Sequence, residues 1–143
     1  MKKAFNFLAV ALFFLVATQV QAQTIVGKWK TIDDETKQPK SIVEIYEQNG
    51  KYYGKIVKLF LDSKANPDPI CDKCEDDRKN KKIIGMVIMT DMKKDGDEFS
   101  GGEICKPSNG KTYRCKMWVE GGKLMVRGYI GLLYKTQEWI KEN

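Results

Sequence analysis

The sequence predicts an all-β protein, an eight-stranded antiparallel barrel of the up-and-down kind. Short segments rich in β-branched and aromatic residues recur along the chain, and turn residues separate them. Most connections have the length of β-hairpin loops, and no segment has the helical spacing of apolar residues. Because a long meander of strands leaves two open edges, we expect it to close into a barrel, with a two-sheet sandwich as the alternative.

An export signal precedes the predicted barrel. A short basic start, an apolar run over residues 4–20 and the small residues of Val20-Gln21-Ala22 form the pattern that signal peptidase recognises. The apolar run falls short of the roughly 20 residues of a membrane-spanning helix. The sequence therefore predicts a cleaved signal peptide over residues 1–22 and a single domain over residues 23–143. It also predicts a periplasmic or secreted location, with no membrane span after cleavage.

Three strands open the predicted domain, over residues 25–32, 41–48 and 51–60. Asn49-Gly50 joins the second strand to the third and is the strongest short signal for a hairpin, because both central residues of a type I′ turn need positive φ. A polar loop that ends at Pro39 joins the first strand to the second. This region therefore forms a three-stranded meander.

Five more strands follow, separated by glycine-containing turns. They cover residues 83–91, 97–105, 111–119, 123–130 and 134–141. Alternation is clearest in the strand over 111–119, where Tyr113, Cys115 and Met117 share a face that we expect to point inward. In the strand over 123–130 both faces are partly apolar, so the sequence leaves its inward face open.

One connection is much longer than the others. Residues 61–82 contain Pro67, Pro69 and the Cys71-Asp72-Lys73-Cys74 motif. Connections beyond roughly 12–15 residues are typically functional or mobile. This segment can cap one mouth of the barrel.

Composition excludes several classes of function. The chain has 25 Lys and Arg against 19 Asp and Glu, interspersed along the sequence, and no histidine. Without the signal peptide the basic count falls from 25 to 23, a net charge of +4, which indicates solubility rather than a nucleic-acid footprint. The absence of imidazole excludes the usual serine and cysteine hydrolase arrangements and most catalytic zinc sites. We expect no enzymatic activity, no cofactor and no metal.

The four cysteines predict disulfides, because an exported chain meets an oxidising environment. Cys71 and Cys74 are expected to pair within the long connection. A second bridge is expected between Cys105 and Cys115. It depends on the hairpin register, because a two-residue turn places them on opposite faces and a loop one residue longer places them on the same face. A redox-active Cys71–Cys74 dithiol, or a zinc site built on these cysteines, remains a less favoured alternative.

Planar and hydrogen-bonding side chains gather in the last two strands. We expect a pocket for a small apolar or anionic ligand, and its predicted lining is Trp29, Arg127, Tyr129, Gln137 and Trp139. Arg127 suits a carboxylate or similar head group, which its planar fork binds bidentately. The alternative is an envelope accessory protein whose barrel is filled by side chains. An eight-stranded barrel can do either, so the interior volume decides.

Short motifs spread over the whole predicted domain also carry a resemblance. They are Gly27-Lys28-Trp29-Lys30-Thr31-Ile32-Asp33, Ser41-Ile42-Val43-Glu44-Ile45, Tyr53-Gly54-Lys55-Ile56-Val57, Cys71-Asp72-Lys73-Cys74, Gly85-Met86, Asn109-Gly110-Lys111-Thr112-Tyr113, Arg127-Gly128-Tyr129-Ile130-Gly131 and Thr136-Gln137-Glu138-Trp139. Together they resemble the bacterial domain of unknown function 2147, a family that is exported and has no established activity. The sequence departs from the family pattern at Lys106, before Pro107, and at Lys135, before Thr-Gln.

The opening motif Gly27-Lys28-Trp29 is also similar to the first-strand signature of lipocalins. This resemblance implies a lipocalin-like barrel in which Trp29 packs across the closed end. It further implies that a basic residue from a late strand lies above the tryptophan. Arg127 and Lys135 are the expected candidates for that residue.

Overall fold

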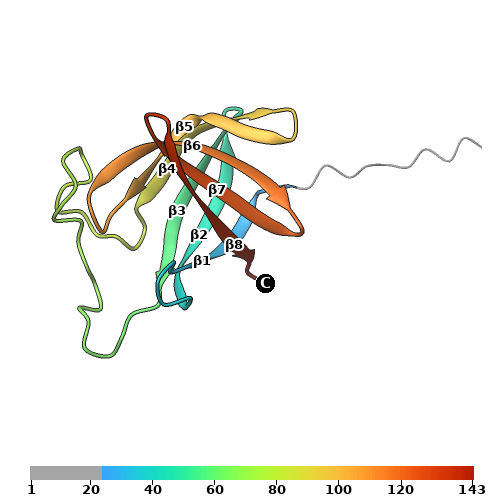
Figure 1. Cartoon of the computed structure of the whole chain (residues 1–143). Helices are drawn as coiled ribbons and strands as arrows, with labels where there is room; N and C mark the ends of the chain where they lie inside the picture. The colour runs from blue at the N-terminus through green and yellow to red at the C-terminus, as the bar shows by residue number, and fades with distance from the viewer. Residues whose placement is uncertain (1–23) are drawn as a thin grey trace, which may run out of the picture.

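The computed structural model describes residues 24–143, which fold into a closed antiparallel barrel of eight strands joined in chain order (Figure 1). The strands are β1 (Gly27–Ile32), β2 (Pro39–Gln48), β3 (Lys51–Leu59), β4 (Val87–Asp95), β5 (Glu98–Lys106), β6 (Lys111–Glu120), β7 (Lys123–Ile130) and β8 (Leu133–Lys141). The predicted fold class is confirmed, and the sandwich alternative is wrong. The predicted signal peptide, residues 1–22, lies outside the described residues. Within residues 24–143 no helix could span a membrane.

The predicted strands agree with the observed ones to within about two residues except for the fourth, which was predicted over residues 83–91 and is observed four residues later, as β4 over Val87–Asp95. The apolar residues from Ile83 to Met86 form a turn instead, in which the Met86 amide donates to the Ile83 carbonyl at 3.1 Å. Gly85 adopts a φ of 91° there and donates its amide to the Ile56 carbonyl at 2.7 Å. Of its apolar side chains, Met86 is buried in the core, Ile83 is partly buried and Ile84 is 40% exposed.

The barrel closes between its first and last strands over a short seam. Two residue pairs, Trp29 with Lys141 and Lys30 with Ile140, form the β1–β8 ladder. The backbone amide of Glu142 adds a hydrogen bond of 2.9 Å to the Lys28 carbonyl. The other seven strand pairs are longer, so this seam is the shortest ladder of the barrel.

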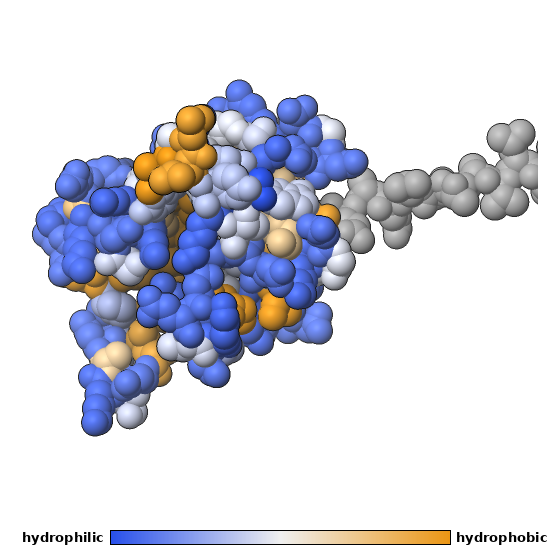
Figure 2. Space-filling model, in the orientation of Figure 1, coloured by the Kyte–Doolittle hydropathy of each residue, from blue (hydrophilic) through white to orange (hydrophobic). Residues whose placement is uncertain are grey.

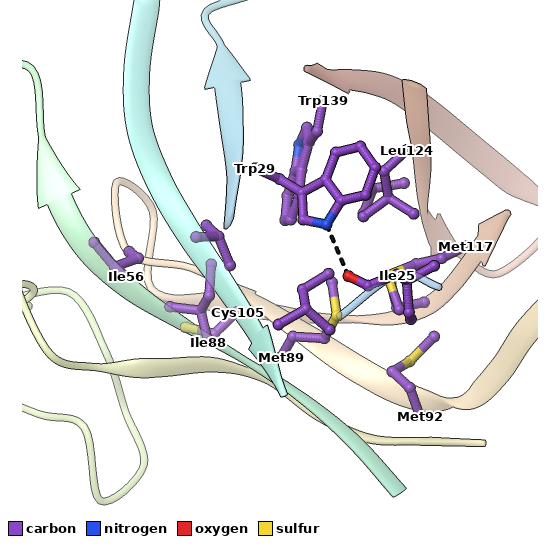
Figure 3. Close-up of a cluster of buried hydrophobic side chains, with 14 of the residues drawn as sticks. Ile25, Trp29, Ile56, Ile88, Met89, Met92, Cys105, Met117, Leu124 and Trp139 are labelled. Carbon is purple, nitrogen blue, oxygen red and sulfur yellow. Dashed lines mark hydrogen bonds between the residues drawn. The ribbon is translucent and has the colours of Figure 1, made fainter. Parts of the chain in front are cut away.

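Large side chains fill one end of the barrel (Figure 3). Trp29 is buried there, as predicted, and its indole N–H donates to the Ile25 carbonyl at 2.8 Å. Met92, Met117 and Leu124 are fully buried at this end as well. This dense packing closes the end and provides most of the core.

The basic residue above Trp29 is Lys141, whose Nζ lies 4.7 Å from the centroid of the indole ring. The expectation of Arg127 or Lys135 is therefore wrong. Lys141 is the β8 residue that pairs with Trp29 in the ladder, whereas Lys135 lies near the other end of β8 and Arg127 faces outward from β7.

The two ends of the barrel differ in their connections. Tight turns close the filled end, and Asn49-Gly50 has φ angles of 52° and 76°, as the predicted type I′ hairpin requires. The β1–β2 loop, the long β3–β4 connection and the β5–β6 and β7–β8 turns lie at the opposite end, with the long connection at the left of Figure 1. We call this opposite end the mouth.

Candidate ligand-binding cavity

A cavity of about 700 Å³ occupies the barrel at its mouth. Its walls are mainly apolar and come from both halves of the chain. They include Ile56, Leu59, Ile88, Ile104, Val126 and Trp139. A volume of this size lies within the range of about 300–1,000 Å³ that is typical of small-molecule sites.

Gly128 contributes to the open space. It lies on the cavity wall in the middle of β7, in register with Cys115 of β6 and Lys135 of β8. A Cβ atom at this position would lie 3.5 Å from the Cβ of Tyr113, an ordinary contact. The position therefore accepts a side chain without moving the backbone, and that side chain would occupy the cavity.

Four polar or indole side chains of the wall are paired with neighbours. The hydroxyl groups of Thr31 and Ser41 lie 2.6 Å apart, and the Ser41 amide donates to the Thr31 oxygen at 3.1 Å. Gln137 donates to Asp34 at 3.0 Å and accepts the indole N–H of Trp139 at 3.3 Å. Within residues 24–143 no buried side-chain polar atom lacks a partner. The interior therefore suits an apolar group better than a polar one.

Three lysines line the mouth, and no carboxylate lines the cavity. They are Lys40, Lys106 and Lys135. Lys135 forms an ion pair of 2.8 Å with Asp34, which lies behind the wall. Partial burial raises the pKa of Asp34, but hydrogen bonds from Lys135 and Gln137 outweigh it and hold the pKa below its usual value. Lys40 and Lys106 form no ion pair among the described residues. The charged side chains that line the cavity itself are all basic.

The structure brings only two of the five predicted lining residues to the cavity. Gln137 and Trp139 lie on its wall. Trp29 is instead packed in the filled end. Arg127 and Tyr129 point outward from β7, so their predicted place in the pocket is wrong.

Arg127 is occupied on the outer surface of the barrel. Its guanidinium stacks 4.1 Å from the ring centroid of Tyr134 and 4.8 Å from that of Trp118, and its Nε donates to Thr136 at 2.8 Å. In β7 the buried positions are Leu124 and Val126, so the alternating residues face solvent. The sequence had left this choice open because Met125 and Tyr129 make the outer face partly apolar as well.

Sequence reasoning missed the lysines of the mouth. Lys40 lies near the start of β2, Lys106 ends β5 and Lys135 lies near the start of β8. In an up-and-down barrel every second connection lies at the same end. Grouping the residues that flank those connections would have placed the three lysines together.

The predicted Cys71–Cys74 disulfide is present in the long connection. We call residues 71–74 the cysteine knuckle. Both its cysteines are fully buried, because the knuckle packs against the β5–β6 turn at the mouth. The Sγ atoms of Cys74 and Cys105 lie 3.9 Å apart at this contact.

The expected bridge between Cys105 and Cys115 is absent, and both residues are buried free thiols. The turn between β5 and β6 is longer than the two-residue case, because Lys106 pairs with Lys111. Cys105 then pairs with Thr112 and Cys115 with Gly102. This register separates the cysteines by roughly 10 Å along the hairpin, beyond the roughly 7 Å between Cα atoms that a disulfide spans.

Neither thiol has the environment of a reactive cysteine. Burial raises the pKa of Cys105, and the charge of Arg78 offsets this only in part. Burial alone raises the pKa of Cys115 to about 12. Within residues 24–143 no group of three or more metal-binding side chains is present.

Comparisons with known proteins agree with this architecture. Residues 27–141 match a family model described as an uncharacterized protein conserved in bacteria, DUF2147. Among solved structures, the chain is similar to protein HP1028 from the human pathogen Helicobacter pylori, which is described as belonging to the lipocalin family. That similarity has a TM-score of 0.71 at 21% sequence identity and covers 84% of each chain, so it shows the fold alone. No curated protein matches the chain.

Proposed function

The chain belongs to the DUF2147 family of bacterial proteins, whose description assigns no activity. From that starting point we propose that it is a binding protein for a small amphipathic ligand with an apolar tail and an anionic head group. The observation that carries this proposal is the apolar cavity of about 700 Å³ with a lysine-lined mouth. We further propose that it acts outside the cytoplasm, on the strength of the export signal in the sequence.

The apolar tail follows from the walls of the cavity. Ile56, Val126 and Trp139 offer only apolar surface to a guest, and the polar groups beside them are paired with one another. Burying apolar surface in such a site is favourable, at about 0.8 kcal/mol for each methylene group. Polar groups of a guest would lose their hydration there without gaining a partner.

The anionic head group follows from the charge of the mouth. Lys40 and Lys106 line the mouth, and among residues 24–143 neither forms an ion pair. A carboxylate or phosphate at the mouth would meet these cations while its tail lies inside. These lysines, and not Arg127, would bind the head group, because the Arg127 guanidinium faces the outer surface.

The unfilled interior also separates this proposal from its main alternative. An accessory protein that binds only macromolecules would need no cavity, and eight-stranded barrels can be filled by side chains. The proposal is binding without chemical conversion, because the lining residues include no histidine or carboxylate that could serve as a general base.

Displacement of a fluorescent fatty acid tests the proposal. The purified chain without residues 1–22 is stripped of bound lipid and titrated with a dansyl-labelled fatty acid, which palmitate then displaces. Gly128→Phe fills the cavity and should weaken binding on the order of tenfold or more. Met125→Phe, on the outer face of the same strand, is the matched control and should bind as the parent protein does.

Chain length provides a second readout. Across a series of saturated fatty acids, affinity should rise by up to about fourfold for each added methylene until the cavity is full. Absence of binding in the parent protein, or unchanged binding in Gly128→Phe, would contradict the proposal. Binding that does not depend on chain length would favour a surface site and hence the accessory protein.

A further inference from the structure

The tip of the β7–β8 hairpin is an exposed apolar knob. Leu132 is 98% exposed and Leu133 77% exposed, and Ile130 and Tyr134 beside them are also mostly exposed. The hairpin projects at the top of Figure 1, and Figure 2 shows its tip as a hydrophobic protrusion on a largely hydrophilic surface. We call residues 130–134 the apolar tip.

The fold gives no reason for leucine at the end of this turn. Ile130 pairs with Leu133, so Gly131 and Leu132 are the two turn residues, and Gly131 has a φ of 56°. Glycine at the first position satisfies a type II′ turn, and polar residues are common at the second. The Leu132 side chain is almost fully exposed, so it contributes nothing to the packing of the barrel. An exposed cluster of this kind marks a contact with another surface.

Two arginines contact the apolar tip. Arg114 donates from its guanidinium to the Gly131 carbonyl at 3.3 Å, and Arg127 stacks on Tyr134 at 4.1 Å. Neither arginine forms an ion pair among residues 24–143. No acidic residue lies between Arg127 and Lys135 in the sequence. Two leucines, a tyrosine and two arginines thus share one projection.

This combination matches the interface of an anionic bilayer. Leucine side chains enter the boundary between head groups and acyl chains, and tyrosine rings are enriched at the level of the head groups. Arginines beside them attract anionic lipid, and this attraction is screened by salt. We propose that the apolar tip docks the protein on the surface of a membrane that contains anionic phospholipid.

The apolar tip lies at the mouth of the cavity, so docking on a membrane also places the mouth beside the lipid. Ile130, Leu133 and Tyr134 line the cavity as well as forming the tip. Phe60 and Leu61, at the start of the long connection, continue the apolar rim and are partly exposed. A docked barrel therefore turns its mouth toward the lipid, so that a ligand with an acyl tail passes between bilayer and cavity without crossing water. This route rests on the proposed function, whereas docking itself does not.

A second copy of the chain fits the apolar tip less well. The tip is convex, so a partner copy would have to receive it in a concavity, and the cavity mouth is the candidate. That mouth is lined by Lys40, Lys106 and Lys135. A basic projection entering a basic opening is repelled, which leaves the lipid surface as the better match.

Co-sedimentation with vesicles tests the docking. The chain without residues 1–22, stripped of lipid, is mixed with vesicles of phosphatidylethanolamine and phosphatidylglycerol, or of phosphatidylcholine alone. We expect binding to the anionic vesicles that weakens as salt is raised. Leu132→Asp should lower the partition coefficient on the order of tenfold, because it replaces the deepest apolar group with a charge. Leu132→Trp should keep or strengthen binding.

Two further variants complete the design. Ile140→Asp changes a partly exposed residue at the far end of β8 and should leave vesicle binding unchanged. Gly128→Phe should still bind vesicles although it fails to bind the dansyl-labelled fatty acid. Leu132→Asp should bind that probe in solution with the affinity of the parent protein, because Leu132 does not line the cavity. Docking and ligand binding are therefore lost in different variants.

Three results would overturn the docking proposal. The first is absence of vesicle binding by the parent protein. The second is equal binding by Leu132→Asp or equal binding to phosphatidylcholine. The third is a concentration-dependent dimer that Leu132→Asp abolishes, without vesicle binding, which would assign the apolar tip to a second copy of the chain.

Discussion

Gly110 of the β5–β6 turn lies directly against the carbonyl group of Lys73 in the cysteine knuckle, and the contact leaves no room for a Cβ atom. The φ of Gly110 is 72°, a conformation that glycine adopts without cost. Gly110 is therefore required for two independent reasons: its positive φ, and the lack of room for a Cβ atom beside Lys73. This contact seats the long connection at the mouth of the cavity.

Gly110→Ala is expected to destabilise the protein more than Gly50→Ala does. Gly50 has a φ of 76°, but a Cβ there meets nothing within 4 Å, so its replacement should cost only the left-handed conformation, about 1–2 kcal/mol. Gly110→Ala adds the displacement of the cysteine knuckle. Urea unfolding of both variants measures the difference in free energy of unfolding. Equal losses would show that the knuckle is not held by this contact.

Stability should fall at alkaline pH because of a buried thiol. Burial raises the pKa of Cys115 from 9.0 to about 12, so the folded state resists ionisation that the unfolded chain allows. This contribution is complete well below pH 9 and is lost as pH rises from 9 toward 12, by about 1.4 kcal/mol at pH 10. Denaturant unfolding between pH 8 and pH 11 should show a shallower decline in Cys115→Ala than in the parent protein. Parallel curves would mean that Cys115 ionises normally.

Replacing the buried tryptophan of the filled end should be costly. Trp29→Phe removes packing volume and leaves the Ile25 carbonyl without the indole N–H that lies 2.8 Å away. We expect a loss of about 2–4 kcal/mol. Trp118→Phe, on the outer surface, should change stability by less than about 1 kcal/mol. Thermal and urea unfolding of the two variants compare them directly, and similar losses would contradict the assignment of Trp29 to the core.

The lysines of the mouth should select for a charged head group. Lys40→Gln and Lys106→Gln are each expected to weaken palmitate binding by about two- to fivefold, the range for a solvent-exposed charge pair. Hexadecanol, which has the same tail without the charge, should bind these variants and the parent protein equally. Lys94→Gln at the filled end is the control, and raised salt should reduce the differences. If the alcohol and the acid lose affinity equally, the lysines act on packing and not on charge.

The sequence predicted the barrel because hairpin signals are local. Asn49-Gly50 fixes a turn by its own conformational preference, and β6 alternates clearly between buried and exposed residues. The start of β4 could not be predicted in this way, because Ile83 to Met86 are as apolar as a strand. Their conformation is decided by hydrogen bonds to Ile56, which is distant in sequence.

The cavity was harder to predict than the barrel. Gln137 and Trp139 were identified because planar and hydrogen-bonding side chains are concentrated in this part of β8, and both do lie on the cavity wall. Arg127 was misplaced because Met125 and Tyr129 make the outer face of β7 partly apolar and hide which face is buried. The bridge from Cys105 to Cys115 failed for a related reason. A turn two residues longer than the shortest case changes every pair in a hairpin, and the turn sequence does not fix its length.

The short seam between β1 and β8 determines when this protein can complete its fold. A chain is synthesised from its N-terminus, and the ladder that closes the barrel joins Trp29 of β1 to Lys141 of β8, the eighth strand in chain order. Until β8 leaves the ribosome, β1 and β7 remain unpaired edges and no closed barrel exists. The barrel therefore stays open until β8 has been synthesised. That is the state in which a translocation channel accepts a polypeptide, and it suits the export that residues 1–22 predict.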